Sequence, residues 1–204
     1  MIISISGVPG SGKTSIAKLL AARLGVPFFS MGGLRGKMAL ERGITLDELN
    51  KLGETDATTD TSVDDYQREL GKKENAFVIE GRLSWHFIPH SFKIFLDCDP
   101  REAARRIFEA RQNTSDIDRI DIPTSDVSSE RQDEPLYGSA EDAERDIANR
   151  VASDDRRYAK YYGVNYRDPS HYDLVFDTTK MKGAEETADA ILARLQANKD
   201  FRSD

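Results

Sequence analysis

Near the start of the chain stands Gly7-Val8-Pro9-Gly10-Ser11-Gly12-Lys13-Thr14, the stretch that predicts the fold. It follows an apolar run at residues 1–5 that is typical of a buried strand. It precedes a predicted helix at residues 15–24, where apolar side chains recur at helical spacing. A G-x-x-x-x-G-K-[ST] motif between a strand and a helix indicates a phosphate-binding loop; the alternative is a glycine-rich turn without a ligand. We therefore expect this segment to bind a nucleoside triphosphate.

The residue types of this loop match the chemistry of phosphate binding. Glycines let backbone N–H groups turn inward around phosphate oxygens, and the helix N-terminus adds a partial positive charge. The Lys13 ammonium is placed to reach the β- and γ-phosphates of ATP, and the Thr14 hydroxyl to join the ligands of Mg²⁺. The expected ATP-binding residues are Gly7, Val8, Pro9, Gly10, Ser11, Gly12, Lys13, Thr14 and Ser15.

Length and composition narrow the class of protein. The chain has 204 residues, of which 38% are hydrophobic and 32% charged, so we expect one soluble globular domain. No apolar stretch approaches the roughly 20 residues that span a bilayer. A single cysteine, Cys98, excludes an intramolecular disulfide framework and a cysteine-based zinc site. The lone cysteine favours a reducing cytoplasm, and the formal charge of −7 argues against binding to nucleic acid. We expect a monomer that binds nucleotides and no membrane.

Predicted strands and helices alternate along the chain. After the first strand, further strands are expected at residues 26–29, 76–80, 92–96 and 174–176. Helices are expected at residues 31–42, 45–51, 61–73 (with Asp60 or Thr61 as its cap), 100–111, 140–162 and 184–195. This order predicts an α/β fold with a five-stranded parallel sheet and helices on both faces. Ligands then bind at the carboxyl ends of the strands, where Gly7, Ser30, Glu80 and Asp97 fall.

One segment departs from this alternation. Residues 113–139 are rich in Ser, Thr, Asp and Glu, contain two prolines, and show no helical stripe of apolar residues. A connection this long predicts a lid extension or a disordered loop.

Several further blocks carry a resemblance to a known family. They are Phe29–Gly32, Lys37–Ala39, Glu41–Gly43, Gln67–Leu70, Val78–Leu83, Arg156–Tyr158 and Tyr172–Val175. Together with the loop, they make the chain similar to the nucleoside monophosphate (NMP) kinases, and more narrowly to the archaeal-type cytidylate kinases. The similarity covers nearly the whole chain apart from the acidic insertion, and Glu80-Gly81-Arg82-Leu83 and the late arginine block point to this branch.

The resemblance implies both an architecture and an activity. It implies a P-loop NMP kinase fold in which residues 1–204 form a single domain. Its core would comprise residues 1–30, 76–111 and 172–197, with NMP-binding helices at 31–74 and a lid, including the insertion, at 112–162. The activity implied is in-line transfer of the γ-phosphoryl group of ATP, with Mg²⁺, to CMP or dCMP.

Arg150, Asp154 and Arg157 share one face of the predicted helix at residues 140–162, because they are spaced by four and three residues. Taken alone, the spacing is also that of a solvated helix face with a salt bridge. The resemblance implies that Arg150 and Asp154 approach the acceptor nucleotide and that Arg157 stabilises the transferring phosphoryl group. The expected catalytic residues are therefore Lys13, Arg150 and Arg157.

Glu80 ends the predicted strand at residues 76–80, and Arg82 follows it. Asp97 follows the next predicted strand, at residues 92–96. The resemblance places Arg82 on the acceptor phosphate or near its base; the alternative is an ion pair with Glu80 or Asp97. Either carboxylate could hold Mg²⁺-bound water, cap a helix or pair with Lys13. Ser30 offers a hydroxyl contact to the acceptor.

Three more residues are candidates for the acceptor site. A carboxylate at Asp60 or Asp64 could accept a hydrogen bond from the exocyclic amine of cytosine; the alternatives are a helix cap at Asp60 and a surface acid at Asp64. The family usually has an aromatic residue followed by an arginine in the helix after Ser30. This chain has Arg35-Gly36 there, so Arg35 would supply the charge from a position rotated by about 100°.

Two other functions remain open from the sequence. The first is a P-loop kinase for another acceptor, such as AMP, UMP or a small hydroxylated metabolite. The second is a nucleotide-dependent switch that uses the acidic insertion to bind a partner.

Overall fold

The computed structural model describes residues 1–56, 58–112 and 137–197 of the chain. Most of the acidic insertion predicted at residues 113–139 therefore lies outside the described residues. Within them, the five predicted strands are present as β1 (Ile2–Gly7), β2 (Phe28–Ser30), β3 (Phe77–Glu80), β4 (Phe92–Asp97) and β5 (Leu174–Asp177). All of their pairings are parallel, in the order β2-β3-β1-β4-β5, which confirms the predicted α/β fold with a five-stranded parallel sheet.

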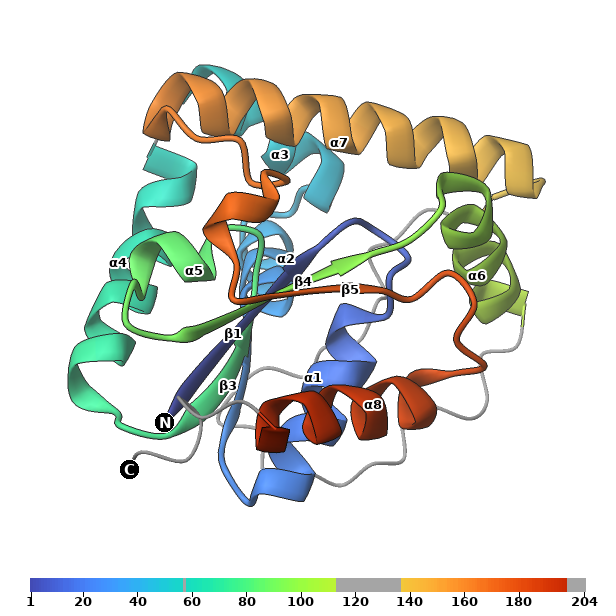
Figure 1. The fold of residues 1–204 in the computed structure, drawn as a ribbon. Helices are drawn as coiled ribbons and strands as arrows, with labels where there is room; N and C mark the ends of the chain where they lie inside the picture. The colour runs from blue at the N-terminus through green and yellow to red at the C-terminus, as the bar shows by residue number, and fades with distance from the viewer. Residues whose placement is uncertain (57, 113–136, 198–204) are drawn as a thin grey trace.

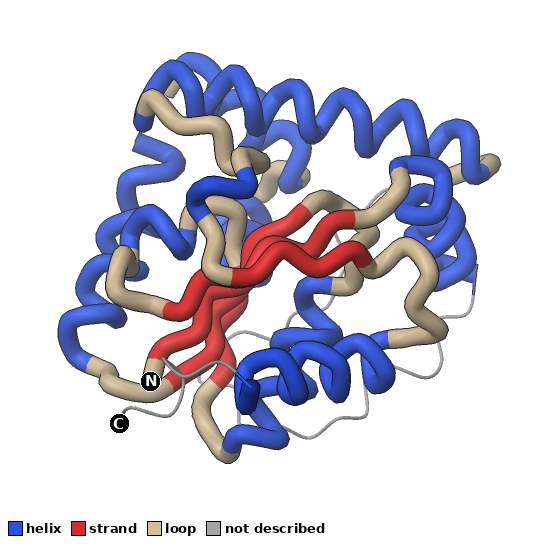
Figure 2. The backbone as a smooth tube through the Cα atoms, in the orientation of Figure 1, coloured by secondary structure: helices blue, strands red, loops and turns tan. Residues whose placement is uncertain are grey.

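The central strand of the sheet leads straight into the phosphate loop. Every residue of β1 is buried, because β3 and β4 flank it and helices cover both faces of the sheet. Ile5 lies opposite Glu80 of β3, and Gly7 lies opposite Leu96 of β4. The carboxyl ends of the strands thus meet at one edge of the sheet, as predicted (Figure 2).

The helices agree with the sequence in position but differ at several ends. They are α1 (Lys13–Leu24), α2 (Met31–Glu41), α3 (Leu46–Thr55), α4 (Thr58–Lys73), α5 (Ser84–Phe87), α6 (Pro100–Gln112), α7 (Ala140–Tyr162) and α8 (Ala184–Ala197). The bounds of α7 are those predicted, with Ser139 as N-cap and Gly163 in the left-handed conformation at its end. The four-residue helix α5 and a short 3₁₀ helix at Pro169–His171 were not predicted, because neither is long enough to show a periodic pattern.

The start of α4 corrects one prediction. The helix begins at Thr58, so neither Asp60 nor Thr61 is its cap. Instead, Asp56 Oδ1 accepts a hydrogen bond from the Thr58 backbone N–H at 2.9 Å. A carboxylate two residues ahead of Thr58 therefore satisfies a donor of the first turn and starts the helix earlier.

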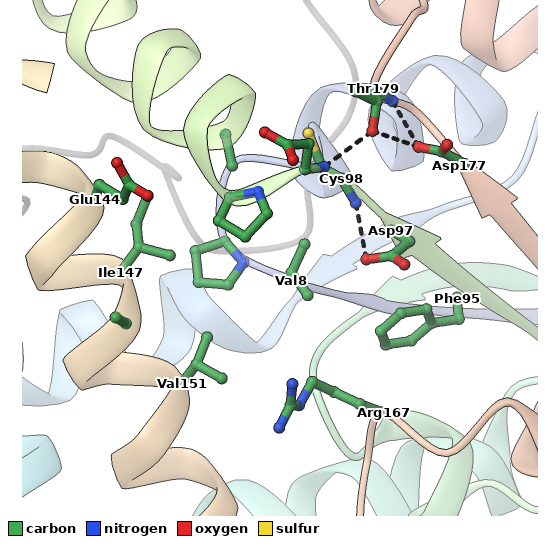
Figure 3. A pocket seen from close by; sticks show the side chains of 15 residues that line it. Val8, Phe95, Asp97, Cys98, Glu144, Ile147, Val151, Arg167, Asp177 and Thr179 are labelled. Carbon is green, nitrogen blue, oxygen red and sulfur yellow. Dashed lines mark hydrogen bonds between the residues drawn. The ribbon is translucent and has the colours of Figure 1, made fainter. Parts of the chain in front are cut away.

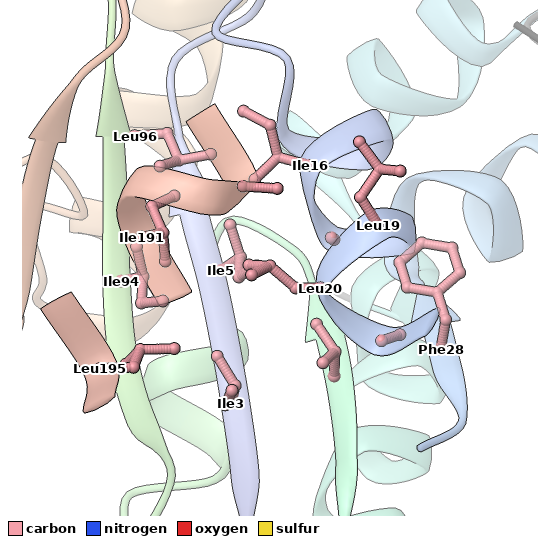
Figure 4. Packing of buried hydrophobic residues seen from close by; sticks show 14 residues of the cluster. Ile3, Ile5, Ile16, Leu19, Leu20, Phe28, Ile94, Leu96, Ile191 and Leu195 are labelled. Carbon is pink, nitrogen blue, oxygen red and sulfur yellow. The ribbon is translucent and has the colours of Figure 1, made fainter. Parts of the chain in front are cut away.

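Helices cover both faces of the sheet. On one face, α1 and α8 pack against β1 and β4 through a cluster that includes Ile5, Leu20, Ile94 and Ile191 (Figure 4). On the other face, α2 and α4 lie against β3, while α5 and α7 lie towards β4 and β5 (Figure 1). Helix α7 crosses above the carboxyl edge of the sheet (Figure 1). Among the described residues, no helix has the length and apolar character needed to cross a bilayer.

Candidate active site

The phosphate loop has the backbone that its glycines predict. Gly10 has φ +76°, and a Cβ on it would lie 2.6 Å from the Ala103 carbonyl oxygen at the start of α6. Only glycine accommodates both this conformation and this close approach. Gly12, at φ +82°, precedes α1, which begins at Lys13 rather than at the predicted Ser15. The loop therefore ends directly on the N-terminus of a twelve-residue helix, where phosphate is favoured.

Side chains of the loop bind back onto the loop itself. Lys13 Nζ donates to the Val8 carbonyl oxygen at 2.7 Å, and Ser11 Oγ donates to the same oxygen at 2.8 Å. The lysine ammonium thus lies next to the backbone of the loop at Val8. This position is consistent with the predicted contact to β- and γ-phosphates.

Glu80 lies beside Thr14, as one of the two predicted magnesium arrangements requires. Thr14 Oγ1 donates to Glu80 Oε1 at 3.4 Å, and Ser30 Oγ donates to the same carboxylate oxygen. Glu80 and Ser30 are both buried, and these hard oxygen atoms are ligands that Mg²⁺ prefers. Among the described residues, no group of three or more acidic, His or Cys side chains could hold a metal. The pair of Thr14 and Glu80 therefore fits a Mg²⁺ ion whose other ligands are water and nucleotide phosphates.

Asp97 lies on the other side of the loop. Since β1 separates β3 from β4, Glu80 and Asp97 end strands on opposite sides of Gly7. Asp97 Oδ1 accepts from the Cys98 N–H at 2.9 Å, and its side chain lines a cavity of about 630 Å³ (Figure 3). The wall on one side is Val8 and Pro9 of the loop, and on the other it is α7. A cavity of this size between the loop and α7 is within the range of ligand sites.

A buried cluster joins Arg82 to Asp154 and Arg157. Arg82 Nε is ion-paired with Asp154 Oδ2, and Arg157 Nη2 lies 2.8 Å from Asp154 Oδ1. The alternative pairing of Arg82 with Glu80 or Asp97 is therefore wrong. Only 3% of the Arg157 side chain is exposed, so the alternative of a solvated helix face is wrong as well. Both alternatives fail because Arg82, which follows β3, packs against α7. The spacing of residues along α7 does not reveal this contact.

Electrostatics hold this cluster in its charged form. Burial by itself would raise the pKa of Asp154, but the charges of Arg82 and then Arg157 outweigh it and keep that pKa below its ordinary value. Burial would lower the pKa of Arg82, whereas Asp154 raises it, and the net shift is upward. Two buried arginines therefore share one carboxylate, and the Arg82 carbonyl oxygen accepts from Ser6 Oγ at 3.0 Å, directly before the phosphate loop.

Arg150 lies on the same helix but pairs elsewhere. Its Nη1 is 3.9 Å from Asp146 Oδ2, one turn back along α7. Its charge still contributes to the low pKa of Asp154. Arg150 is thus close enough to the cluster to act on Asp154.

Arg35 of α2 and Arg157 of α7 meet at one side chain of α3. Arg35 Nη2 donates to Asn50 Oδ1 at 3.1 Å, and Arg157 Nη1 donates to the same oxygen at 3.5 Å. Arginines from α2 and α7 therefore converge on one point. Sequence reasoning missed Asn50, since a single amide in a short helix carries no pattern.

Of the two carboxylates predicted to bind the base, the structure describes the side chain of Asp64 but not that of Asp60. Asp64 is buried, and its Oδ2 accepts from the Tyr162 hydroxyl at 2.5 Å, so the alternative of a surface acid is wrong. Tyr162 was also missed, because it lies 98 residues away along the chain. Asp60 lies in the first turn of α4, but its side chain is outside the described residues.

These features define a class of protein. A phosphate loop at the carboxyl edge of a parallel sheet, with buried arginines beside it, is the architecture of a P-loop kinase, an enzyme that transfers a phosphoryl group. More particularly, the chain belongs to the cytidylate kinase-like family, whose model matches residues 2–180. The family resemblance of the sequence is thereby confirmed.

Curated relatives agree with this assignment. The chain is 36% identical over 180 residues to the cytidylate kinase of Methanocella arvoryzae, covering 88% of this chain and 89% of the relative. It is 30% identical over 200 residues to the cytidylate kinase of Archaeoglobus fulgidus, covering 98% and 97% of the two chains. Both relatives match across nearly their whole length.

Solved structures resemble the fold at lower sequence identity. An uncharacterized protein from Eubacterium ventriosum aligns with a TM-score of 0.64 and 17% identity, over 97% of this chain and 99% of that one. Shikimate kinase from Bacteroides thetaiotaomicron aligns with a TM-score of 0.58 and 16% identity, over 96% and 98%. At such identities the likeness supports the fold alone.

Proposed function

We propose that this protein transfers the γ-phosphoryl group of ATP to a pyrimidine nucleoside monophosphate, with CMP or dCMP as the acceptor. The observation that carries the proposal is the convergence of three arginines: Arg35 and Arg157 share Asn50, and Arg82 and Arg157 share Asp154. A nucleotide switch needs no such group of three arginines. The names of the archaeal relatives support cytosine as the base of the acceptor.

Each side of the site has its own task in this proposal. The loop at Gly7–Ser15 binds the phosphates of ATP, with Lys13 on the β- and γ-phosphates. Thr14, with water held by Glu80, would bind Mg²⁺, which when bound neutralises charge on the donor phosphates. Arg157, with Arg150 near it, stabilises the charge on the transferring group, because such a reaction needs positioning and charge rather than a nucleophilic side chain.

The acceptor binds on the side of α2, α3 and α4. Arg35 and Arg82 bind its phosphate, and Ser30 contributes a hydroxyl contact. Asp154 approaches the ribose, and Asp60 and Asp64 lie on the helix that flanks the base. A carboxylate there accepts from the cytosine amine, which uracil lacks. In this arrangement, residues 1–204 form a single kinase domain with NMP-binding helices at 31–74 and a lid at 112–162, and the protein acts as a monomer.

A coupled assay of ADP release tests this function directly. The purified full chain is given Mg-ATP with CMP, dCMP, UMP, AMP or GMP, one at a time. We expect strong turnover with CMP or dCMP, and loss of turnover with Lys13→Ala. Turnover with AMP or UMP alone would contradict the base assignment. Turnover of ATP that ignores all five monophosphates would overturn the kinase proposal in favour of a switch.

A further inference from the structure

One amide oxygen joins the two arginines that come from different helices. Asn50 is on α3, between Arg35 of α2 and Arg157 of α7, and its Oδ1 accepts hydrogen bonds from both guanidinium groups. Two like charges brought together repel each other, and a shared acceptor offsets part of that repulsion. An amide oxygen does this without neutralising either charge.

Gly53, one turn after Asn50 on α3, leaves room for the Arg157 side chain. A Cβ on Gly53 would lie 3.0 Å from Arg157 Nη1 and 3.3 Å from its Cδ. Contacts this short would displace the guanidinium group. The bare α-carbon of Gly53 therefore lets the Arg157 side chain lie directly against α3.

Glu54 completes the contact between α3 and α7. Its Oε1 accepts from Ser153 Oγ at 2.5 Å and from Arg156 Nη2 at 3.0 Å, and its backbone oxygen accepts from Lys160 Nζ at 2.8 Å. The hydrogen bonds of Ser153 and Arg156 lower the pKa of the Glu54 carboxyl, so it is ionised at neutral pH. Gly53 and Glu54 lie three and four residues after Asn50, so the three residues present one face of α3 to α7.

We propose that Asn50 is a positioning residue for phosphoryl transfer, an inference that rests on the proposed function. Its neutral amide holds Arg35 at the geometry that reaches the acceptor phosphate and Arg157 at the geometry that reaches the transferring phosphoryl group. A carboxylate at this position would hold the same arginines but would oppose the negative acceptor phosphate. Neutrality at position 50 is therefore part of the site.

The test compares Asn50→Ala with Asn50→Asp, and uses Lys51→Ala as the control. Lys51 is the next residue of the same helix and is exposed. Turnover of the wild-type chain is measured first, and the variants are then assayed with whichever monophosphate it takes. The quantities are kcat, KM for ATP, KM for the acceptor, and Tm.

We expect Asn50→Ala to lower kcat roughly 10- to 100-fold, because the arginines lose their common orientation. Asn50→Asp keeps both hydrogen bonds and strengthens them by charge, so its Tm should match or exceed that of the wild type. Its KM for the acceptor should nevertheless rise about tenfold or more, since like charge disfavours phosphate. Lys51→Ala should behave as the wild type.

Two results would overturn the inference. If Asn50→Asp were stable and as active as the wild type, the amide would have only a structural role. If the wild type phosphorylated no monophosphate at all, the proposed function would fail, and the inference with it. Because the wild type is assayed first, failure of the proposed function is distinguished from failure of the role of Asn50. Asn50→Asp tests that role even if Asn50→Ala does not fold.

Discussion

Arg157 carries a buried positive charge that Asp154 compensates and that α3 holds in place. We expect Arg157→Ala to lower kcat about 100- to 1,000-fold, as for loss of one group that stabilises transition-state charge. Arg157→Lys should recover part of the rate, because it keeps the charge but lacks the planar fork. KM for ATP should stay within about twofold, since the loop binds ATP. Steady-state kinetics of the three proteins check this.

Arg145→Ala is the matched control for Arg157. Arg145 lies on the same helix, is exposed, and pairs only with Asp142 among the contacts the structure describes for its side chain. It should keep the wild-type kcat. Equal loss in both variants would indicate damage to α7 rather than loss of a catalytic group.

The pKa of Asp154 predicts a pH dependence of stability. Its folded pKa lies below the ordinary value of 3.8, so its stabilising effect is present above that value and is lost as the pH falls through the folded pKa. Asp154→Asn should cost roughly 3–5 kcal/mol at pH 7, because it leaves Arg82 and Arg157 buried without a full counter-charge. Urea unfolding at pH 7 and pH 3 should show a smaller pH effect in the variant. Parallel pH effects in both proteins would contradict this.

At the scale of elements, α3 decides how the acceptor side of the site is held. Its N-terminus is closed by a capping box in which Thr45 Oγ1 accepts from the Glu48 N–H at 3.2 Å, and Glu48 Oε2 accepts from the Thr45 N–H at 2.8 Å. The two residues thus satisfy donors that the helix itself leaves unpaired.

Loss of this cap should weaken α3 and the site together. Thr45→Ala should cost about 0.5–2 kcal/mol in free energy of unfolding. It should also raise KM for the acceptor, since Asn50 and Gly53 lie on the same helix. Thr55→Ala, at the exposed end of α3, should have little effect on either quantity. Denaturant unfolding and steady-state kinetics of both variants measure the difference; an effect as large in Thr55→Ala would speak against the cap.

At the scale of the whole molecule, the core between the sheet and helices α1 and α8 supports the site. Leu20 is fully buried within it, whereas Leu40 of α2 is 66% exposed. Leu20→Ala should lower the free energy of unfolding by about 2–5 kcal/mol through lost burial and the cavity left behind. Leu40→Ala should change it by less than about 0.5 kcal/mol.

These two leucine variants also test the predicted single domain. Thermal and denaturant unfolding should show one cooperative transition that Leu20→Ala moves as a whole. Separate transitions for the loop side and the α2–α4 side would contradict a single domain. An equal loss of stability in both variants would contradict the assignment of the core.

The sheet, the loop and the long helix followed from local pattern. Apolar runs that end in Gly7, Glu80 or Asp97 predicted the strands and their common edge, because buried parallel strands are apolar on both faces. The bounds of α7 agree with the prediction, and its caps at Ser139 and Gly163 act within one turn. Short elements such as α5 show no period and could not be found in this way.

Which charged groups meet was decided by the tertiary structure alone. The sequence placed Asp154 and Arg157 on one helix face, but the partner Arg82 comes from 72 residues earlier. Likewise, both Glu80 and Asp97 end strands near the loop, and only the order of the sheet brings Glu80 to Thr14. Residue type and spacing act over a few residues, whereas burial, ion pairing and the bridge at Asn50 depend on contacts made when distant elements pack.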